Sequence, residues 1–300
     1  NIASTTNYVN NLKLRKVKDT QEMQVKGLPE NPKIAFITWS PDEQKIAFTH
    51  TTATGVELWV IDVATATAKR LTEAVLNANL GSPFLWKNDN SQILVLQLPA
   101  QRAALVDQKK DLPTGPTVSV SEGKKSQNRT YQDLLKNKTD EANFEALVQS
   151  ELYWVGLDGK KSLFKPAAIY AGMSFSPDGN YLMLTQIERP YSYIVPMSRF
   201  PQRSLVYRTD GTLVQQVNEV PLTEIMPKGF SSVRKGKRNM TWRPDQPATL
   251  FYVEALDEGD AGKTVTHLDA LWVCEAPFTA APREFMRTQQ RCAGIAWGYE

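Results

Sequence analysis

The sequence contains few of the residues that most metal and redox sites require. Two histidines, His50 and His267, and two cysteines, Cys274 and Cys292, are all that occur in 300 residues. This nearly excludes a histidine-rich metal site, and the lack of a Cys-x-x-Cys pair argues against zinc and thioredoxin-type redox chemistry. We therefore expect no metal and no cofactor. A disulfide between the two cysteines and two free thiols both remain open.

A strong charge and long apolar runs are also missing. The net charge is +3, because 35 Lys and Arg residues are nearly balanced by 32 Asp and Glu residues. This excess is too small to indicate a nucleic-acid partner. No apolar run approaches the roughly 18 residues that a membrane-spanning helix needs, so we expect no membrane span. Hydrophobic residues make up 41% of the chain, which is typical of a globular protein with a large core.

Catalytic motifs are absent as well. The Gly-x-Ser-x-Gly motif of α/β-hydrolases is incomplete at residues 172–176 and at 229–233. We find no phosphate-binding loop and no dinucleotide fingerprint, so we expect no catalytic residue in the chain. The first residue is Asn1 rather than Met. A signal peptide is therefore expected to have been removed or to lie upstream.

The sequence does contain an internal repeat. Four segments share an apolar strand, an aromatic residue, then Pro or Asn followed by Asp, a turn and a second apolar strand. They are centred on residues 39–42, 86–89, 175–178 and 242–245. A second hairpin follows each pair, and two of these hairpins turn at Asp-Gly. The pattern predicts an all-β fold, a β-propeller of four-stranded antiparallel blades.

We expect about four whole blades and two partial ones. Residues 8–14 and 23–28 have the pattern of the outer half of an earlier blade, and residues 294–298 that of the first strand of a later one. Residues 1–300 would thus form one partial propeller domain. Its longest insertion, about 99–151, is expected to contain a small helix capped by Thr130, with Asp133 in the first turn. The insertion is either a packed surface excursion or an arm that touches another domain.

Strand order predicts that the long loops share one face of the propeller. These are residues 99–151, 188–203, 221–238 and 255–268, and long loops on a rigid scaffold usually carry binding. Two of the stretches are basic, and they indicate either a solvated face or a surface that binds anions. The candidate substrate-binding residues are Arg189, Tyr191, Tyr193, Arg199, Arg234 and Arg238. Aromatic residues are too sparse among them for nucleic acid.

The repeated aspartates, Asp42, Asp89, Asp178 and Asp245, allow a calcium interpretation. No loop has the spaced oxygen ligands of an EF-hand, so hairpin turns explain these residues better.

Several ordered blocks of sequence resemble the prolyl oligopeptidase family of serine peptidases, in particular its glutamyl endopeptidase branch. The most specific blocks are Arg-Pro-Tyr-Ser-Tyr at 189–193 and Ser-Ser-Val-Arg-Lys-Gly at 231–236, supported by Leu-Pro-Thr-Gly-Pro at 112–116. The similarity runs over about residues 31–300. It implies an N-terminal propeller followed by a C-terminal α/β-hydrolase domain that carries Ser, Asp and His.

The catalytic triad of that family has no counterpart here. The resemblance therefore implies that the hydrolase domain lies beyond residue 300 and that this chain alone is inactive. The parent protein would be a serine peptidase cleaving after Glu or Asp. The propeller would gate access, help bind the peptide substrate, and contact the hydrolase domain of the same polypeptide.

Two alternatives remain. One is the propeller of a dipeptidyl or acyl aminopeptidase relative, which would need paired carboxylates to hold a free amine. Glu188 is the nearest candidate, with no obvious partner. The other is a non-enzymatic binding scaffold. A Gly-x-Ser-x-Gly motif encoded beyond Glu300 would separate the enzymes from the scaffold. We expect a periplasmic or secreted location, with the cytoplasm as the alternative.

Overall fold

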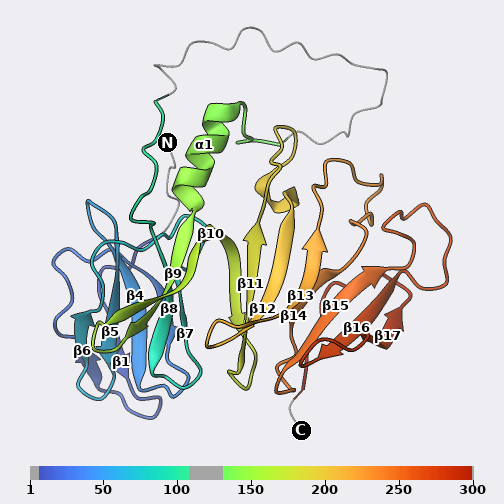
Figure 1. The fold of residues 1–300 in the computed structure, drawn as a ribbon. Coiled ribbons are helices and arrows are strands. Elements are labelled where there is room, and N and C mark those ends of the chain that lie inside the picture. Colours follow the sequence, from blue (N-terminus) through green and yellow to red (C-terminus); the bar gives the residue numbers. More distant parts are fainter. Residues whose placement is uncertain (1–6, 108–130, 299–300) are drawn as a thin grey trace. The chain divides into compact units, whose positions relative to one another are not determined.

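The computed structural model describes residues 7–107 and 131–298 and is built almost entirely from strands (Figure 1). The all-β prediction is confirmed. The chain divides into two compact units. Unit 1 consists of residues 1–102 and 148–168, and unit 2 of residues 103–147 and 169–300. Each unit is described by itself.

Unit 1 contains two blades and an N-terminal hairpin. The first blade has the antiparallel order β3 (Ile34–Trp39), β4 (Lys45–Thr51), β5 (Val56–Asp62) and β6 (Thr67–Arg70). The second has β7 (Phe84–Trp86), β8 (Gln92–Gln97), β9 (Ser150–Gly156) and the first half of β10 (Lys161–Phe175). The hairpin pairs β1 (Lys13–Arg15) with β2 (Glu22–Gln24).

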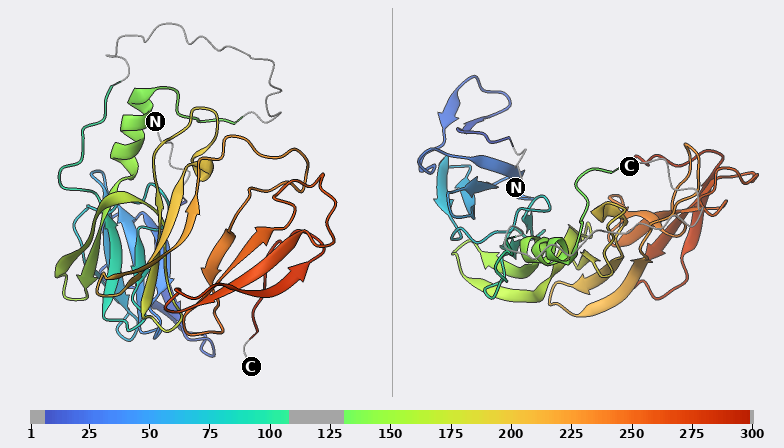
Figure 2. Two further views of the ribbon diagram at one scale, coloured as in Figure 1. Left: turned by 45° about the vertical axis from the view of Figure 1, so that its right-hand side comes forward. Right: turned by 90° about the horizontal axis from the view of Figure 1, so that it is seen from above.

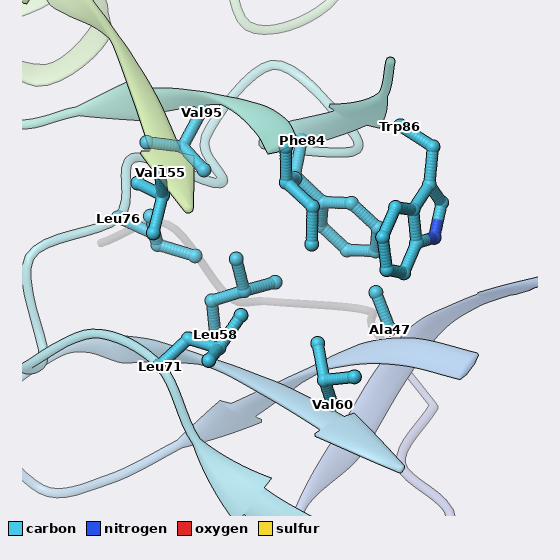
Figure 3. Close-up of a cluster of buried hydrophobic side chains, with 10 residues drawn as sticks. Ala47, Leu58, Val60, Leu71, Leu76, Phe84, Trp86, Val95 and Val155 are labelled. Carbon is cyan, nitrogen blue, oxygen red and sulfur yellow. The ribbon is translucent and has the colours of Figure 1, made fainter. Parts of the chain in front are cut away.

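The core of unit 1 lies between the faces of its strands. One cluster joins Ala47, Leu58 and Val60 of the first blade to Phe84 and Trp86 of the second (Figure 3). A second cluster lies on the opposite face of the first blade, where the N-terminal hairpin covers it. Successive residues of a strand point to opposite faces of the sheet. Strand β4 therefore contributes buried side chains to both clusters.

Unit 2 contains two further blades and the helix. The third blade has the second half of β10, then β11 (Tyr181–Ile187), β12 (Gln202–Arg208) and β13 (Leu213–Val220). The fourth has β14 (Arg238–Trp242), β15 (Thr249–Ala255), β16 (Asp269–Glu275) and β17 (Arg283–Thr288). The helix α1 (Lys138–Val148) and a short 3-10 helix (Met197–Arg199) lie in loops. The core of unit 2 includes Met183, Trp242 and Phe278.

The predicted four-strand repeat is confirmed, with one difference at β10. The repeat predicts four separate strands for each blade, but the single 15-residue strand β10 pairs with β9 of the second blade and with β11 of the third. No turn sequence interrupts this stretch. The register instead shifts between Lys165 and Ala168, around Pro166, whose nitrogen has no hydrogen to donate to a neighbouring strand.

The predicted start of the helix was wrong. Thr130 lies outside the described residues, and α1 begins at Lys138 rather than near Asp133. The Asn137 side chain accepts a hydrogen bond from the Asp140 N–H at 2.8 Å, which caps the first turn. Asp133 has a φ of 57°, which no α-helix accommodates.

The repeated aspartates lie in hairpin turns, as predicted. Ser40 Oγ donates to Asp42 Oδ1 at 2.6 Å, and Ser176 Oγ donates to Asp178 Oδ1 at 2.5 Å. In each turn the same carboxylate oxygen also accepts a backbone N–H two residues further on. These contacts account for the Ser-Pro-Asp sequence by turn chemistry.

Two smaller questions from the sequence are answered by the fold. Cys274 and Cys292 are both free thiols, and burial raises the pKa of Cys274. In the described part of the chain, no helix is long and apolar enough to cross a membrane.

Candidate functional site

The long loops of unit 2 contact one another in series. The connection between β11 and β12 meets the connection between β13 and β14, where the Arg199 carbonyl accepts the Thr223 N–H at 3.0 Å. The latter meets the connection between β15 and β16, where the Gly259 carbonyl accepts the Val233 N–H at 3.0 Å. Helix α1 joins the first of these loops through Arg189. For the described loops of unit 2, the shared face is confirmed.

Arg189 fastens α1 to the connection between β11 and β12. Its Nε and Nη2 each lie 2.8 Å from an oxygen of Glu145, and its Nη1 lies 3.1 Å from Glu141 Oε2. The two glutamates are four residues apart and so lie on one face of the helix. Figure 1 and the left view of Figure 2 show α1 beside this loop. A single guanidinium thus holds two carboxylates of α1.

The two predicted tyrosines complete this group, which we call the α1 cluster: Glu141, Glu145, Arg189, Tyr191 and Tyr193. The Tyr191 hydroxyl donates to Glu145 Oε1 at 2.7 Å, and the Tyr193 hydroxyl donates to Glu141 Oε1 at 2.8 Å. Three of the six predicted site residues therefore come together, and each contacts a carboxylate of α1.

Electrostatics in the α1 cluster favour the charged carboxylates. Burial acts to raise the pKa of both glutamates, but hydrogen bonds outweigh it, from Lys138 and Tyr193 to Glu141 and from Arg189 to Glu145. Both pKa values lie below the ordinary 4.5. A lowered pKa means that the folded state stabilises the ionised form, so the contacts weaken when the carboxylates are protonated.

Acidification should therefore release α1. The stabilisation from Glu141 and Glu145 is fully present above their ordinary pKa of 4.5. It is lost as the pH falls through their lower folded pKa values. The rate of amide hydrogen exchange in residues 138–148, corrected for intrinsic rates, should therefore rise as the pH falls from about 5 to about 3, where these carboxylates become protonated. In the variant Glu141→Gln/Glu145→Gln, exchange should be fast at pH 7 and show no further acid response. A full acid response in that variant would contradict the assignment.

Arg238 belongs to a different group, the buried ion cluster: Arg238, Asp257, Asp269 and Arg291. Asp269 is 0% exposed; its Oδ1 lies 2.7 Å from Arg238 Nη2 and 2.9 Å from Arg291 Nη1. Arg291 also pairs with Asp257, which is likewise buried. This cluster joins the first residues of β14 and β16 to Asp257, which lies between β15 and β16, and to Arg291, which follows β17.

The two remaining arginines have other partners. The Arg199 guanidinium lies 5.2 Å from the Tyr131 ring centroid, a cation–π contact. Arg234 donates to the carbonyls of Lys235 and Lys237. Burial and the nearby charge of Arg238 lower the pKa of Arg234. Whether any of the six residues contacts a substrate stays a prediction.

Sequence reasoning missed the acidic partners. Glu141 and Glu145 carry a weak signal, because two glutamates at helical spacing can bind one cation. Asp257, Asp269 and Arg291 carry none, because their pairing depends on the register of the fourth blade.

Glu188, the candidate for holding a free amine, is paired. Its carboxylate forms a salt bridge with Arg203 across the end of β11 and β12. This occupied carboxylate gives the aminopeptidase alternative no support.

Comparison with known proteins identifies relatives along nearly the whole chain. No protein-family model matches it. It is 38% identical over 288 residues to "Probable glutamyl endopeptidase, chloroplastic" from Oryza sativa subsp. japonica. It is 37% identical over 287 residues to the protein of the same name from Arabidopsis thaliana. Each match covers 92% of this chain and 30% of the relative.

Among solved structures, an oligogalacturonate lyase from Vibrio parahaemolyticus gives a TM-score of 0.47 at 13% identity. That match covers 93% of this chain and 59% of the lyase.

The two plant relatives correct one expectation and confirm another. The expected periplasmic or secreted location is wrong on this comparison, because both are chloroplast proteins by name. The chain spans about a third of their length, 30%. The resemblance drawn from the residue blocks is confirmed: over 92% of its length, this chain is similar to a segment of the glutamyl endopeptidases of plant chloroplasts.

Proposed function

We propose that this chain is the propeller part of a serine peptidase and that it gates and helps bind peptide substrates. The observation that carries the proposal is the match to two named peptidases along 92% of the chain. The series of loops in unit 2 supports it, because a continuous loop surface on a rigid sheet scaffold suits binding. The hydrolase domain would be supplied by the same polypeptide beyond residue 300.

We further propose that the parent enzyme cleaves after Glu or Asp and that propeller arginines help select these side chains. A guanidinium matches a carboxylate in geometry and charge. A hydrogen bond to a charged group contributes about 1.5–3 kcal/mol, which corresponds to roughly ten- to a hundredfold in selectivity.

The four arginines are expected to differ in this role. Arg189 and Arg238 each bind a carboxylate within the chain, so their loss should mainly reduce stability. Arg234 donates to main-chain carbonyls and is partly desolvated. Since an approaching carboxylate would lower the cost of burying this cation, Arg234 is the strongest candidate for reading substrate charge.

Arg234→Ala in the full-length enzyme should reduce the ratio of kcat/KM for Glu over Gln at the cleaved position by roughly tenfold or more. The matched control is Arg189→Ala, which should lower thermal stability and leave that ratio near the wild-type value. If all four Arg→Ala variants, including Arg199→Ala and Arg238→Ala, keep the wild-type ratio, the propeller arginines do not select the acidic side chain.

Two experiments test the proposal that the chain is the propeller part of a serine peptidase. The 300-residue chain alone should cleave no Glu-containing peptide, because it has no nucleophile motif. The gene beyond Glu300 should encode Gly-x-Ser-x-Gly. A gene without that motif would favour the non-enzymatic scaffold.

A further inference from the structure

One loop of unit 2 holds an aromatic side chain fully in solvent. Phe230 lies in the connection between β13 and β14, and its relative exposure is 104%. Ile225 of the same loop is 85% exposed, and Ile194 of the connection between β11 and β12 is 61% exposed. Single exposed apolar residues are common on protein surfaces. Phe230 differs from them in the way the main chain around it is held.

The turn that carries Phe230 is closed by its own hydrogen bonds. The Ser232 hydroxyl donates to the Lys228 carbonyl at 2.6 Å, and the Ser232 N–H donates to the Gly229 carbonyl at 3.3 Å. Gly229 has a φ of 117°, a conformation that residues with a side chain rarely adopt. Phe230 therefore lies within a tight turn of residues 228–232.

This turn is also anchored to the rest of unit 2. Arg291 Nε donates to the Ser231 carbonyl at 2.9 Å, and the same guanidinium belongs to the buried ion cluster. The Val233 N–H donates to the Gly259 carbonyl at 3.0 Å, which fastens the loop to the connection between β15 and β16. The main chain is thus fixed next to a side chain that is left open to solvent.

These contacts explain the sequence block Ser-Ser-Val-Arg-Lys-Gly at 231–236. Residues 231–233 anchor the turn, and Arg234 donates to two carbonyls of its own loop. Gly236 has a φ of 84°, which favours glycine. The block therefore builds a defined loop, and Phe230 immediately precedes it.

The loops that carry the other two apolar residues are joined to each other. Ser192 is 3% exposed, and its hydroxyl donates to Glu224 Oε1 at 2.7 Å and accepts the Ile194 N–H at 3.1 Å. Glu224 directly precedes Ile225. Exposed apolar side chains are thus presented on two connected loops of unit 2 (Figure 1).

The charge around Phe230 indicates what binds there. Between residues 226 and 244 the sequence contains six basic residues and no acidic residue. A partner that carries both an apolar side chain and a negative charge is complementary to such a loop. A peptide with an apolar residue near an acidic one has this chemistry.

We propose that Phe230 is a specificity-determining residue of the parent peptidase and binds an apolar side chain of the peptide substrate near its acidic residue. This inference rests on the proposed function. An aromatic side chain on a preorganised loop binds at a low cost in entropy. Arg234, the strongest candidate for reading substrate charge, follows four residues later, so the two Cα atoms are at most about 14 Å apart. An extended peptide spans this distance in about four residues.

Cleavage of a peptide series by the full-length enzyme tests the contact. Each peptide has one Glu among Gly, Ser and Ala residues, with a Leu at one of the four positions before or after it. A reference peptide has no Leu. In the wild type, Leu at one or more positions should raise kcat/KM over the reference by roughly three- to tenfold, as expected for a partly buried side chain. Phe230→Ala should bring this ratio close to one, and Phe230→Leu should keep most of it.

Val17→Ala is the matched control. Val17 is 98% exposed and is also flanked by two lysines, but it lies in the N-terminal hairpin of unit 1. This variant should keep the wild-type ratio. Phe230→Ala should leave Tm unchanged, because the ring is fully exposed.

The outcomes separate this inference from the proposed function. An enzyme that cleaves the reference peptide but shows no Leu gain, or keeps the full gain in Phe230→Ala, overturns the role of Phe230 alone. An enzyme that cleaves no Glu-containing peptide overturns both. A lowered Tm for Phe230→Ala would show that the ring packs against another part of the polypeptide. Binding to anionic phospholipid vesicles that Phe230→Ala abolishes would show contact with a lipid surface. Either result would overturn the assignment to substrate.

Discussion

Replacing Asp269 by alanine should lower the free energy of unfolding by about 3–5 kcal/mol, the cost of breaking a buried ion pair. Its carboxylate accepts hydrogen bonds from Arg238, Arg291 and the Cys292 N–H at 2.7–2.9 Å. Arg291 would retain Asp257. Arg238 would remain buried, with no other carboxylate partner among the residues that the structure describes. Urea-induced unfolding followed by tryptophan fluorescence measures the change.

The control for this experiment is an exposed pair in the same blade. Glu284 binds Arg287 at 2.8 Å on the surface of β17, and Glu284→Ala should cost about 0–1 kcal/mol. If Asp269→Ala costs no more than Glu284→Ala, the buried ion cluster does not stabilise the fourth blade.

Replacing Trp242 by alanine should cost about 3–5 kcal/mol, as for other buried aromatic residues. The side chain is buried in the core of unit 2, with its ring centroid 5.8 Å from that of Phe278, and it donates to the Ser174 carbonyl. Trp242→Phe keeps most of the packing and loses the hydrogen bond, so it should cost about 1 kcal/mol. The difference between the variants separates packing from hydrogen bonding.

Equal costs for the two Trp242 variants would contradict this division. Chemical unfolding in parallel with Trp86→Ala and Trp86→Phe provides the matched measurement in unit 1, where the same bond reaches Thr38. In both units, the alanine variant should lower the free energy of unfolding more than the phenylalanine variant does.

The blades could be predicted because their pattern is local. Ser40 and Asp42 form their turn within a few residues, and the apolar strands that flank it follow directly in the chain. A sequence pattern reflects such contacts because the interacting groups recur at fixed spacing. The start of α1 was harder to predict, since Thr130 and Asn137 are both residue types that suit a helix cap.

The pairing of charges could not be predicted in the same way. Arg189 binds Glu145, and Arg238 binds Asp269, across long stretches of chain. Nothing in the sequence around an arginine tells whether its partner is a distant carboxylate or a substrate. The basic loops therefore left the roles of the individual arginines open.

The insertion between β8 and β9 has a consequence for the order of folding. These strands pair Gln97 with Glu151, which closes a loop on the order of 50 residues and loses more chain entropy than a short hairpin does. The first blade needs only residues 34–70, so it can form on the ribosome while the second blade still waits for β9 to be synthesised. During that interval β8 offers an unpaired edge to any other chain nearby, and a chaperone that shields exposed strands would act at this stage of synthesis.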